Sequence, residues 1–272
     1  MEIDHHDQFA ILGHPQRLAV FRMLMRRFPD ALPAGEIAAA TGIKPSTLSV
    51  YLSALRGAGL IRQDRVGTSL RYTADVDRAS GLVDFMFADC CRGRPALCNL
   101  APVAGTDRVM NVMFLCTGNS ARSIFAEALL RDLGQGRFNV FSAGTTPARD
   151  VHLVAGELLR DKGHDTTGLH PKTVEDMMAA GAPEMDFVFT VCDRAANEDC
   201  PAWPGLPVTA HWGIPDPVTA TGTRAERMLA FQQAYGALKS RISAFVALPF
   251  ETLDRSALQQ RLDGLSHLQD TL

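Results

Sequence analysis

The sequence predicts two domains: an N-terminal winged helix-turn-helix, mostly α with a β-hairpin wing, and a C-terminal three-layer α/β domain with a parallel sheet. The length of 272 residues is typical of two domains. Residues 1–92 have the pattern of short helices and a hairpin, whereas residues 108–250 alternate apolar strands with helices. Residues 93–107 contain two prolines and few regularly spaced apolar side chains, and they form the expected linker.

Apolar spacing and helix-breaking residues predict the N-terminal elements. Pro29 and Pro33 end the first helix, and Gly42 is the expected C-cap of the second. A third helix opens at Pro45, because proline suits the first helical position, and Gly57 ends it. The expected helices cover residues 9–28, 34–41, 45–57 and 79–89, and the expected hairpin joins 60–66 to 69–73.

The C-terminal domain shows the alternation of a parallel βαβ sheet. Its predicted strands are 109–115, 138–142 and 187–191, and its predicted helices are 123–133, 151–162 and 224–246. Residues 251–272 carry leucines at steps of four and three, which predicts an amphipathic helix. We expect this helix to pack on its own domain, and a dimerising helix is the alternative.

Composition indicates an ordinary soluble protein, with 46% hydrophobic and 21% charged residues. No apolar run approaches the roughly 20 residues that cross a bilayer, and the acidic, polar N-terminus differs from a secretion signal. We therefore expect a cytoplasmic protein without membrane contacts. The net charge is only -3, so any basic surface for nucleic acid must be local.

A cysteine-containing loop stands between the first apolar strand of the C-terminal domain and the next helix. Backbone N–H groups in such a loop form an anion cradle at the helix N-terminus, and their positive field lowers the pKa of Cys116. Arg122 offers a planar fork for two oxygens of an oxyanion, and Ser123 donates to the thiolate. The alternative is a buried cysteine that precedes an arginine by chance. The loop comprises Cys116, Thr117, Gly118, Asn119, Ser120, Ala121, Arg122 and Ser123.

Two further features suit chemistry at Cys116. Cys192 and Cys200 follow a strand and are separated by seven residues. A zinc pair would need two more ligands at short spacing, and a thiol relay fits the pattern better. Asp216 lies between Pro215 and Pro217 on a stiff loop, which suits a general acid, although the motif alone is also typical of a turn.

From residue 109 to about 246 the chain resembles the thiol-dependent arsenate reductases built on the low-molecular-weight tyrosine phosphatase fold. The Cys116–Ser123 loop, Ser142-Ala-Gly-Thr145, the Cys192/Cys200 pair and Trp212 with Asp216-Pro217 carry the resemblance. It implies that Cys116 attacks arsenate held by the loop and Arg122, while Asp216 protonates the departing hydroxyl. Cys192 then attacks Cys116 and releases arsenite, and Cys200 forms a disulfide with Cys192.

The resemblance implies thioredoxin or a glutaredoxin system as the reductant. The gap between the relay cysteines is slightly longer than in the best-known members, so the choice between them stays open. Asn119, Glu127 and Ser142 match positions that bind a potassium ion in some relatives.

A tyrosine phosphatase is the rival enzyme. Phosphatases of this fold usually carry aromatic residues beside the acid loop, where this chain has Val218-Thr219. Tyr235 is the one tyrosine of the domain, and hydrolysis has no use for Cys192 and Cys200. The sequence therefore favours the reductase.

Residues 9–89 resemble the arsenic-responsive winged-helix repressors of the ArsR type. The carrying features are Leu12-Gly-His-Pro-Gln-Arg-Leu, the segment Ser46–Leu60, and the hairpin with its arginines. A recognition helix in the major groove and a wing on the phosphates are implied. A dimerisation module without DNA binding is the alternative. The residues expected to contact DNA are Ser46, Thr47, Ser49, Tyr51, Arg62, Arg65 and Arg71.

The sensor is expected at Cys90, Cys91 and Cys98. The helix over 34–41 lacks the Cys-x-Cys pair of many such repressors, which excludes sensing there. Three thiolates suit the thiophilic arsenite ion, and zinc is disfavoured because no histidine lies near. Unbound linker thiols are the alternative.

Together these features predict a homodimeric, arsenite-responsive repressor fused to an arsenate reductase, with operator DNA, arsenate, arsenite and a thiol reductant as partners. A second interpretation stays open. In it the chain is a DNA-binding regulator whose C-terminal domain is a phosphatase or a non-catalytic sensor of oxyanions or redox state.

Overall fold

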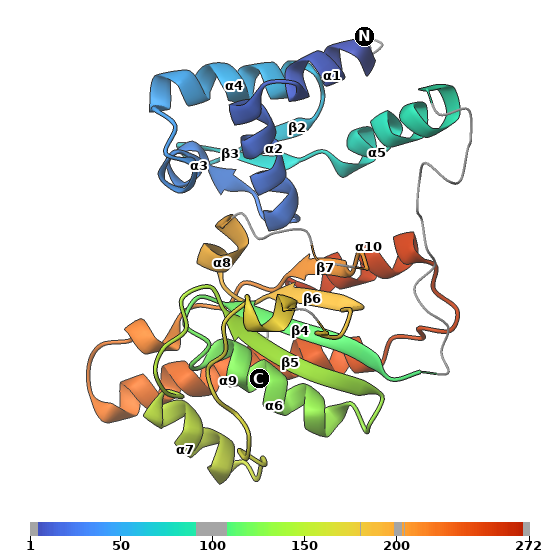
Figure 1. Cartoon of the computed structure of the whole chain (residues 1–272). Helices are drawn as coiled ribbons and strands as arrows, with labels where there is room; N and C mark the ends of the chain where they lie inside the picture. Colours follow the sequence, from blue (N-terminus) through green and yellow to red (C-terminus); the bar gives the residue numbers. More distant parts are fainter. Residues whose placement is uncertain (1–4, 91–107, 180, 199–202, 204, 269–272) are drawn as a thin grey trace. The chain divides into compact units, whose positions relative to one another are not determined.

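The computed structural model describes residues 5–90, 108–179, 181–198, 203 and 205–268. The chain divides into two compact units, Met1–Ala101 and Pro102–Leu272 (Figure 1). Cys91, Cys98, Cys200 and the whole of the expected linker lie outside the described residues. Among the described helices, none is both long and apolar enough to cross a membrane.

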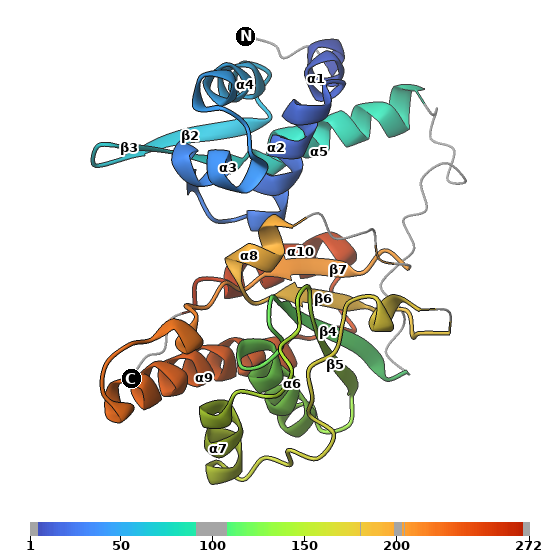
Figure 2. The same ribbon diagram turned by 60° about the vertical axis from the view of Figure 1, so that its left-hand side comes forward.

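The N-terminal unit packs its helices against a small antiparallel sheet. Leu24, Leu48, Leu52 and Leu55 are almost completely buried in its core. The β2–β3 hairpin projects beyond the helices, as a wing does (Figure 2). Its elements are α1 (His5–Leu12), α2 (Pro15–Arg27), β1 (Leu32–Pro33), α3 (Ala34–Thr41), α4 (Pro45–Gly57), β2 (Ile61–Val66), β3 (Ser69–Ala74), α5 (Val76–Phe85) and the π-helical turn η1 (Met86–Cys90).

The single helix predicted over residues 9–28 is wrong, because α1 and α2 are separate helices. Pro15 stands at the start of α2, where its ring restricts His14 to an extended conformation with φ -94° and ψ 124°. The predicted C-cap is confirmed, since Gly42 has a left-handed φ of 67°. The helix predicted over 79–89 starts earlier, because the Asp75 side chain caps α5 by accepting from the Arg78 N–H.

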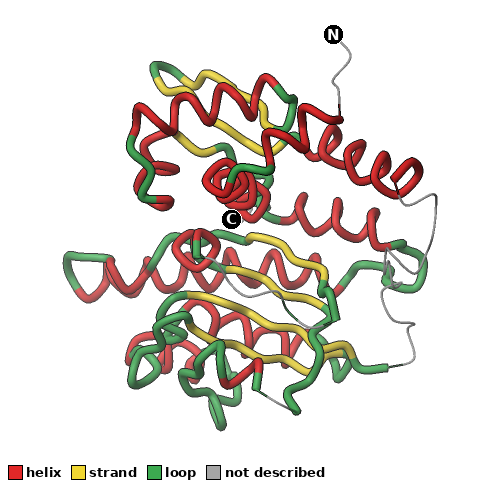
Figure 3. The backbone as a smooth tube through the Cα atoms, turned by 45° about the horizontal axis from the view of Figure 1, so that its top comes forward, coloured by secondary structure: helices red, strands yellow, loops and turns green. Residues whose placement is uncertain are grey.

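The C-terminal unit contains a four-stranded parallel sheet in the order β5-β4-β6-β7. Figure 3 draws its strands in yellow and the helices beside them in red. This arrangement confirms the predicted α/β class. The edge strand β7 was not predicted, because it is four residues long and lacks a continuous apolar run. The elements are β4 (Met110–Cys116), α6 (Arg122–Leu133), β5 (Phe138–Gly144), α7 (Leu153–Asp161), η3 (Asp176–Met178), β6 (Phe187–Thr190), α8 (Asp193–Asn197), β7 (Val208–His211), η4 (Pro217–Thr219), α9 (Arg224–Val246) and α10 (Arg255–Leu265).

Alternate residues of β4 belong to two different cores, as the pleat of a strand requires. Phe114 joins the aromatic core made with α6 and α9, whereas Met113 packs with Val174 and Met185 on the opposite side. Because β4 and β6 are parallel neighbours, their carboxyl ends meet at one edge of the sheet. Open parallel sheets bind their ligands at this edge.

Helix α10 packs on its own unit, as expected for the C-terminal leucine stripe. Leu258 and Leu262 are buried in the same core as α9, and the Trp212 Nε1–H donates to the Leu262 carbonyl over 3.2 Å. The Asp254 carboxylate accepts the Ala257 N–H at 2.8 Å and so caps the helix.

We expect Asp254→Ala to lower the free energy of unfolding of the C-terminal unit by about 1 kcal/mol, because the α10 N-cap is lost. Chemical denaturation followed by tryptophan fluorescence measures this change. Asp254→Ser, which keeps a capping oxygen, is the matched control and should lie close to wild type. Equal losses in both variants would contradict the capping role.

Candidate functional site

The Cys116 loop runs from the carboxyl end of β4 to the N-terminus of α6. Cys116 is 3% exposed, its Sγ lies 2.9 Å from Ser123 Oγ, and the Asn119 N–H donates to it over 3.0 Å. The hydroxyl of Ser123 accepts from Asn119 Nδ2 at 2.8 Å, which leaves its own proton for the sulfur. The sulfur is therefore held by two donors at a helix N-terminus, as the sequence predicted.

The carbonyl groups of the loop are engaged by a neighbouring segment of the chain. The carbonyls of Thr117, Gly118 and Ser120 accept N–H groups of the neighbouring segment from residue 146 to 152, at 2.8 to 2.9 Å. Gly144, at the end of β5, permits this approach, because a Cβ there would lie 2.5 Å from the Thr117 carbonyl oxygen. With these carbonyls engaged and the Asn119 N–H directed at the Cys116 sulfur, the loop suits an anion.

Burial raises the pKa of the Cys116 thiol above its ordinary value. The neighbouring Cys192 raises it further, whereas the hydrogen bonds from Ser123 and Asn119 lower it. The sequence predicts a lowered pKa for Cys116. This prediction is wrong, because desolvation of the sulfur outweighs the hydrogen bonds that it receives.

Removing one of these donors should make the thiolate harder to form. We expect Ser123→Ala to raise the pKa of Cys116, so the thiolate fraction at neutral pH falls and alkylation slows roughly tenfold, about the effect of one hydrogen bond to a charged group. Iodoacetamide alkylation of Cys116 between pH 6 and 10, followed by mass spectrometry, measures this. Ser123→Thr keeps the hydroxyl and is the control. An alkylation profile that moves to lower pH in Ser123→Ala would contradict the assignment.

Arg122 and Asp216 lie together at the same edge of the sheet, although 94 positions separate them. Arg122 donates one N–H to the Ile214 carbonyl at 3.0 Å and another to the Asp216 carboxylate at 2.6 Å. The arginine side chain is 11% exposed and the aspartate 35% exposed, so both border solvent. The predicted oxyanion fork and the predicted acid are therefore neighbours.

Cys192 lies beside the loop, directly after β6. It is 2% exposed, and its Sγ is 3.5 Å from the Thr117 hydroxyl. The sulfur also caps the short helix α8, accepting the Ala195 N–H at 3.4 Å. Two of the three relay thiols predicted from the sequence thus lie at one site, and Cys200 lies outside the described residues.

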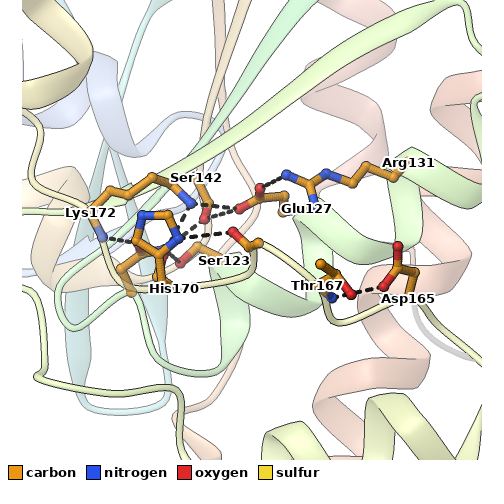
Figure 4. Close-up of polar contacts among 10 residues, drawn as sticks. Ser123, Glu127, Arg131, Ser142, Asp165, Thr167, His170 and Lys172 are labelled. Carbon is orange, nitrogen blue, oxygen red and sulfur yellow. Dashed lines mark hydrogen bonds and ion pairs between the residues drawn. The ribbon is translucent and has the colours of Figure 1, made fainter.

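The predicted potassium-site residues also come together. The Asn119 amide donates to the Ser142 hydroxyl at 2.8 Å, and this hydroxyl donates to Glu127, which is 1% exposed (Figure 4). Lys172, which the sequence analysis missed, lies on the same carboxylate, with Nζ 3.3 Å from Oε2. No sequence signal joins Lys172 to Glu127, since 45 positions separate them.

The predicted DNA-contacting residues of helix α4 differ in exposure. Ser46 and Ser49 are exposed, whereas Thr47 and Tyr51 are half-buried. The Tyr51 hydroxyl lies 2.8 Å from Gln16 Oε1 on α2.

The three predicted arginines of the wing also differ in their exposure and in their contacts. Arg65 is exposed near the hairpin turn, and Arg71 donates to the Ala31 carbonyl at 3.2 Å. Arg62 pairs with Asp75 and Asp77 at 2.9 Å each, and these carboxylates raise its pKa. Arg65 is the wing cation best placed for a phosphate.

Of the predicted sensor cysteines, Cys90 is exposed at the end of η1, and Cys91 and Cys98 lie outside the described residues.

Comparison with known proteins identifies the families of both units. Residues 111–259, more than half of the chain, match the low molecular weight phosphotyrosine protein phosphatase family. The chain belongs to this family. Residues 12–64 match a helix-turn-helix domain, so the two predicted domain types are confirmed in one chain.

Several family members that are similar to this chain are arsenate reductases. The arsenate reductase of Shouchella clausii is 34% identical over 134 residues, which is 49% of this chain and 93% of the relative. The glutaredoxin arsenate reductase of a Synechocystis species is 29% identical, over 50% of this chain and 95% of its own length. A solved arsenate reductase in the phosphate-binding state is 26% identical and covers 51% of this chain and 97% of its own, with a TM-score of 0.40.

Proposed function

We propose that this family member is an arsenate reductase fused to an arsenite-responsive DNA-binding repressor. The observation that supports reduction rather than hydrolysis is the second buried thiol, Cys192, beside the loop of Cys116. A phosphatase needs the oxyanion loop but not this thiol. The arsenate reductases among the relatives support the same choice.

In the proposed reaction, Arg122 and the loop N–H groups hold arsenate. The oxyanion takes the place of the Asp216 carboxyl group on the Arg122 guanidinium. The Cys116 thiolate forms a bond to arsenic, and the departing hydroxide takes the proton of Asp216 and leaves as water. The Cys192 thiolate then attacks the Cys116 sulfur. A disulfide forms, the electron pair of the sulfur–arsenic bond stays on arsenic, and arsenite leaves as As(III).

Cys200 then completes the relay. Its thiolate attacks Cys192, which frees the Cys116 thiol and leaves a Cys192–Cys200 disulfide. A dithiol reductant, thioredoxin or a glutaredoxin system, restores both thiols. The overall reaction oxidises two thiols and reduces one arsenate.

For the N-terminal unit, we propose a homodimer that binds operator DNA with α4 and the wing. Arsenite, the product of the C-terminal unit, binds the thiols of Cys90, Cys91 and Cys98 and weakens DNA binding. The helix-turn-helix match and the exposed Ser46 and Ser49 of α4 support the DNA-binding part.

The test of the enzyme is arsenate-dependent NADPH oxidation, with thioredoxin and its reductase in one arm and glutathione, glutaredoxin and glutathione reductase in the other. We expect turnover in at least one arm. No turnover with arsenate in both arms, together with hydrolysis of p-nitrophenyl phosphate, would identify a phosphatase instead.

The test of the repressor is fluorescence anisotropy with a DNA fragment from upstream of its own coding sequence. We expect arsenite to weaken binding in wild type and to have little effect in Cys98→Ser. Unchanged binding in wild type, or a full arsenite response in Cys98→Ser, would refute the sensor.

A further inference from the structure

Four residues form a closed ring of hydrogen bonds beside the Cys116 loop. Asn119 donates to Ser142, Ser142 donates to Glu127, and the Lys172 ammonium donates to the same Glu127 oxygen. The backbone N–H of Lys172 closes the ring by donating to Asn119 Oδ1 at 2.7 Å. Lys172 thus contacts Asn119 directly and through the carboxylate.

The ring is coupled to the nucleophile. The Asn119 backbone N–H and the Ser123 hydroxyl contact the Cys116 sulfur, and the Asn119 amide contacts that hydroxyl. Asn119 also has a left-handed φ of 43°, which costs a non-glycine residue about 1 kcal/mol or more. The hydrogen bonds of its side chain hold it there, so loss of the ring should loosen the donors to Cys116.

The buried carboxylate of Glu127 explains why the ring contains a cation. Glu127 is 1% exposed, and a buried carboxylate is stable only when it is paired. Arg131 pairs with one of its oxygens from the solvent side, where the arginine is 38% exposed. The Lys172 side chain is only 14% exposed and lies on the oxygen that Ser142 also contacts (Figure 4). Its ammonium further donates to the His170 carbonyl at 3.1 Å.

We propose that the Lys172 ammonium is a built-in monovalent cation that replaces a potassium ion at Asn119, Glu127 and Ser142 and makes the Cys116 loop independent of potassium. The ammonium carries the same single charge as the ion. Because it is covalently attached, it occupies the site without having to bind from solution. Lys172 is a positioning residue. Its effect on arsenate binding rests on the proposed function, whereas its effect on stability does not.

The test is the Tm of wild type, Lys172→Met and Lys239→Met in about 150 mM KCl or choline chloride, which gives equal screening. Lys239 is exposed on α9 and is the matched control. We expect wild type and Lys239→Met to show the same Tm in both salts. In choline chloride, Lys172→Met should have a lower Tm than wild type. Potassium should raise the Tm of this variant by roughly 3–5 °C, the shift expected when the potassium concentration is about ten times the Kd of the new site.

Two outcomes overturn the proposal: a Tm of wild type that rises with potassium, or a Tm of Lys172→Met that potassium does not raise above choline. If Lys172→Met does not fold, the first outcome can still be measured, because it needs only the wild type. The second outcome can then be tested with Lys172→Gln in place of Lys172→Met. If arsenate is reduced, Lys172→Met should also show a raised KM for arsenate in choline, which potassium lowers again. A failure of arsenate reduction leaves the Tm comparison unaffected, so the two proposals fail separately.

Discussion

Cys116→Ser should abolish arsenate reduction, with a loss of at least about 10³-fold in kcat. A serine hydroxyl fits the same position beside Ser123 and Asn119, but it is far less nucleophilic than a thiolate at neutral pH and forms no disulfide with Cys192. The loop itself should persist, because its carbonyl contacts do not involve the sulfur. Arsenate-dependent NADPH oxidation gives the rate.

The control for this variant is binding of an oxyanion to the intact loop. Isothermal titration with phosphate should give comparable affinity for Cys116→Ser and wild type, which separates lost chemistry from lost structure. Turnover of Cys116→Ser within tenfold of wild type would show that another thiol is the nucleophile.

The second large effect is expected for Arg122→Lys. Lysine keeps the charge but loses the planar fork, and Arg122 uses two separate N–H groups for the Ile214 carbonyl and the Asp216 carboxylate. We expect kcat/KM for arsenate to fall about 10²- to 10³-fold, the range found for loss of one preorganised donor to a developing charge. Steady-state kinetics at saturating reductant measure this.

Thermal unfolding of Arg122→Lys distinguishes lost recognition from lost folding, because the arginine also joins α6 to the loop after β7. A Tm close to that of wild type with the stated fall in kcat/KM supports the assignment. Near-normal kcat/KM would mean that the loop N–H groups alone hold the oxyanion.

The contiguous part of the site was predictable from the sequence. A buried strand, the five residues 117–121 and a helix follow one another, so the position of Cys116 and its donors depends on local structure alone. Helix α9 was predicted at its observed bounds, and the structure shows a local signal at its start, where Thr223 and Glu226 form a capping box.

The parts that depend on long-range contacts were not predictable. Lys172 meets Glu127 because the segment after α7 returns to the end of β5, where the Gly144 N–H donates to the Lys172 carbonyl. The raised pKa of Cys116 likewise depends on how deeply the packed fold buries the sulfur. Residue types and spacing carry no information on such burial.

The proposed relay depends most on Cys192, and arsenite release by reduced protein without recycling reductant tests the role of this thiol most directly. Wild type and Cys200→Ser should each release about one arsenite per chain, since one attack by Cys192 suffices, and Cys200→Ser should then hold a Cys116–Cys192 disulfide. Cys192→Ser should release none. One arsenite per chain from Cys192→Ser, or none from Cys200→Ser, would contradict the proposed relay.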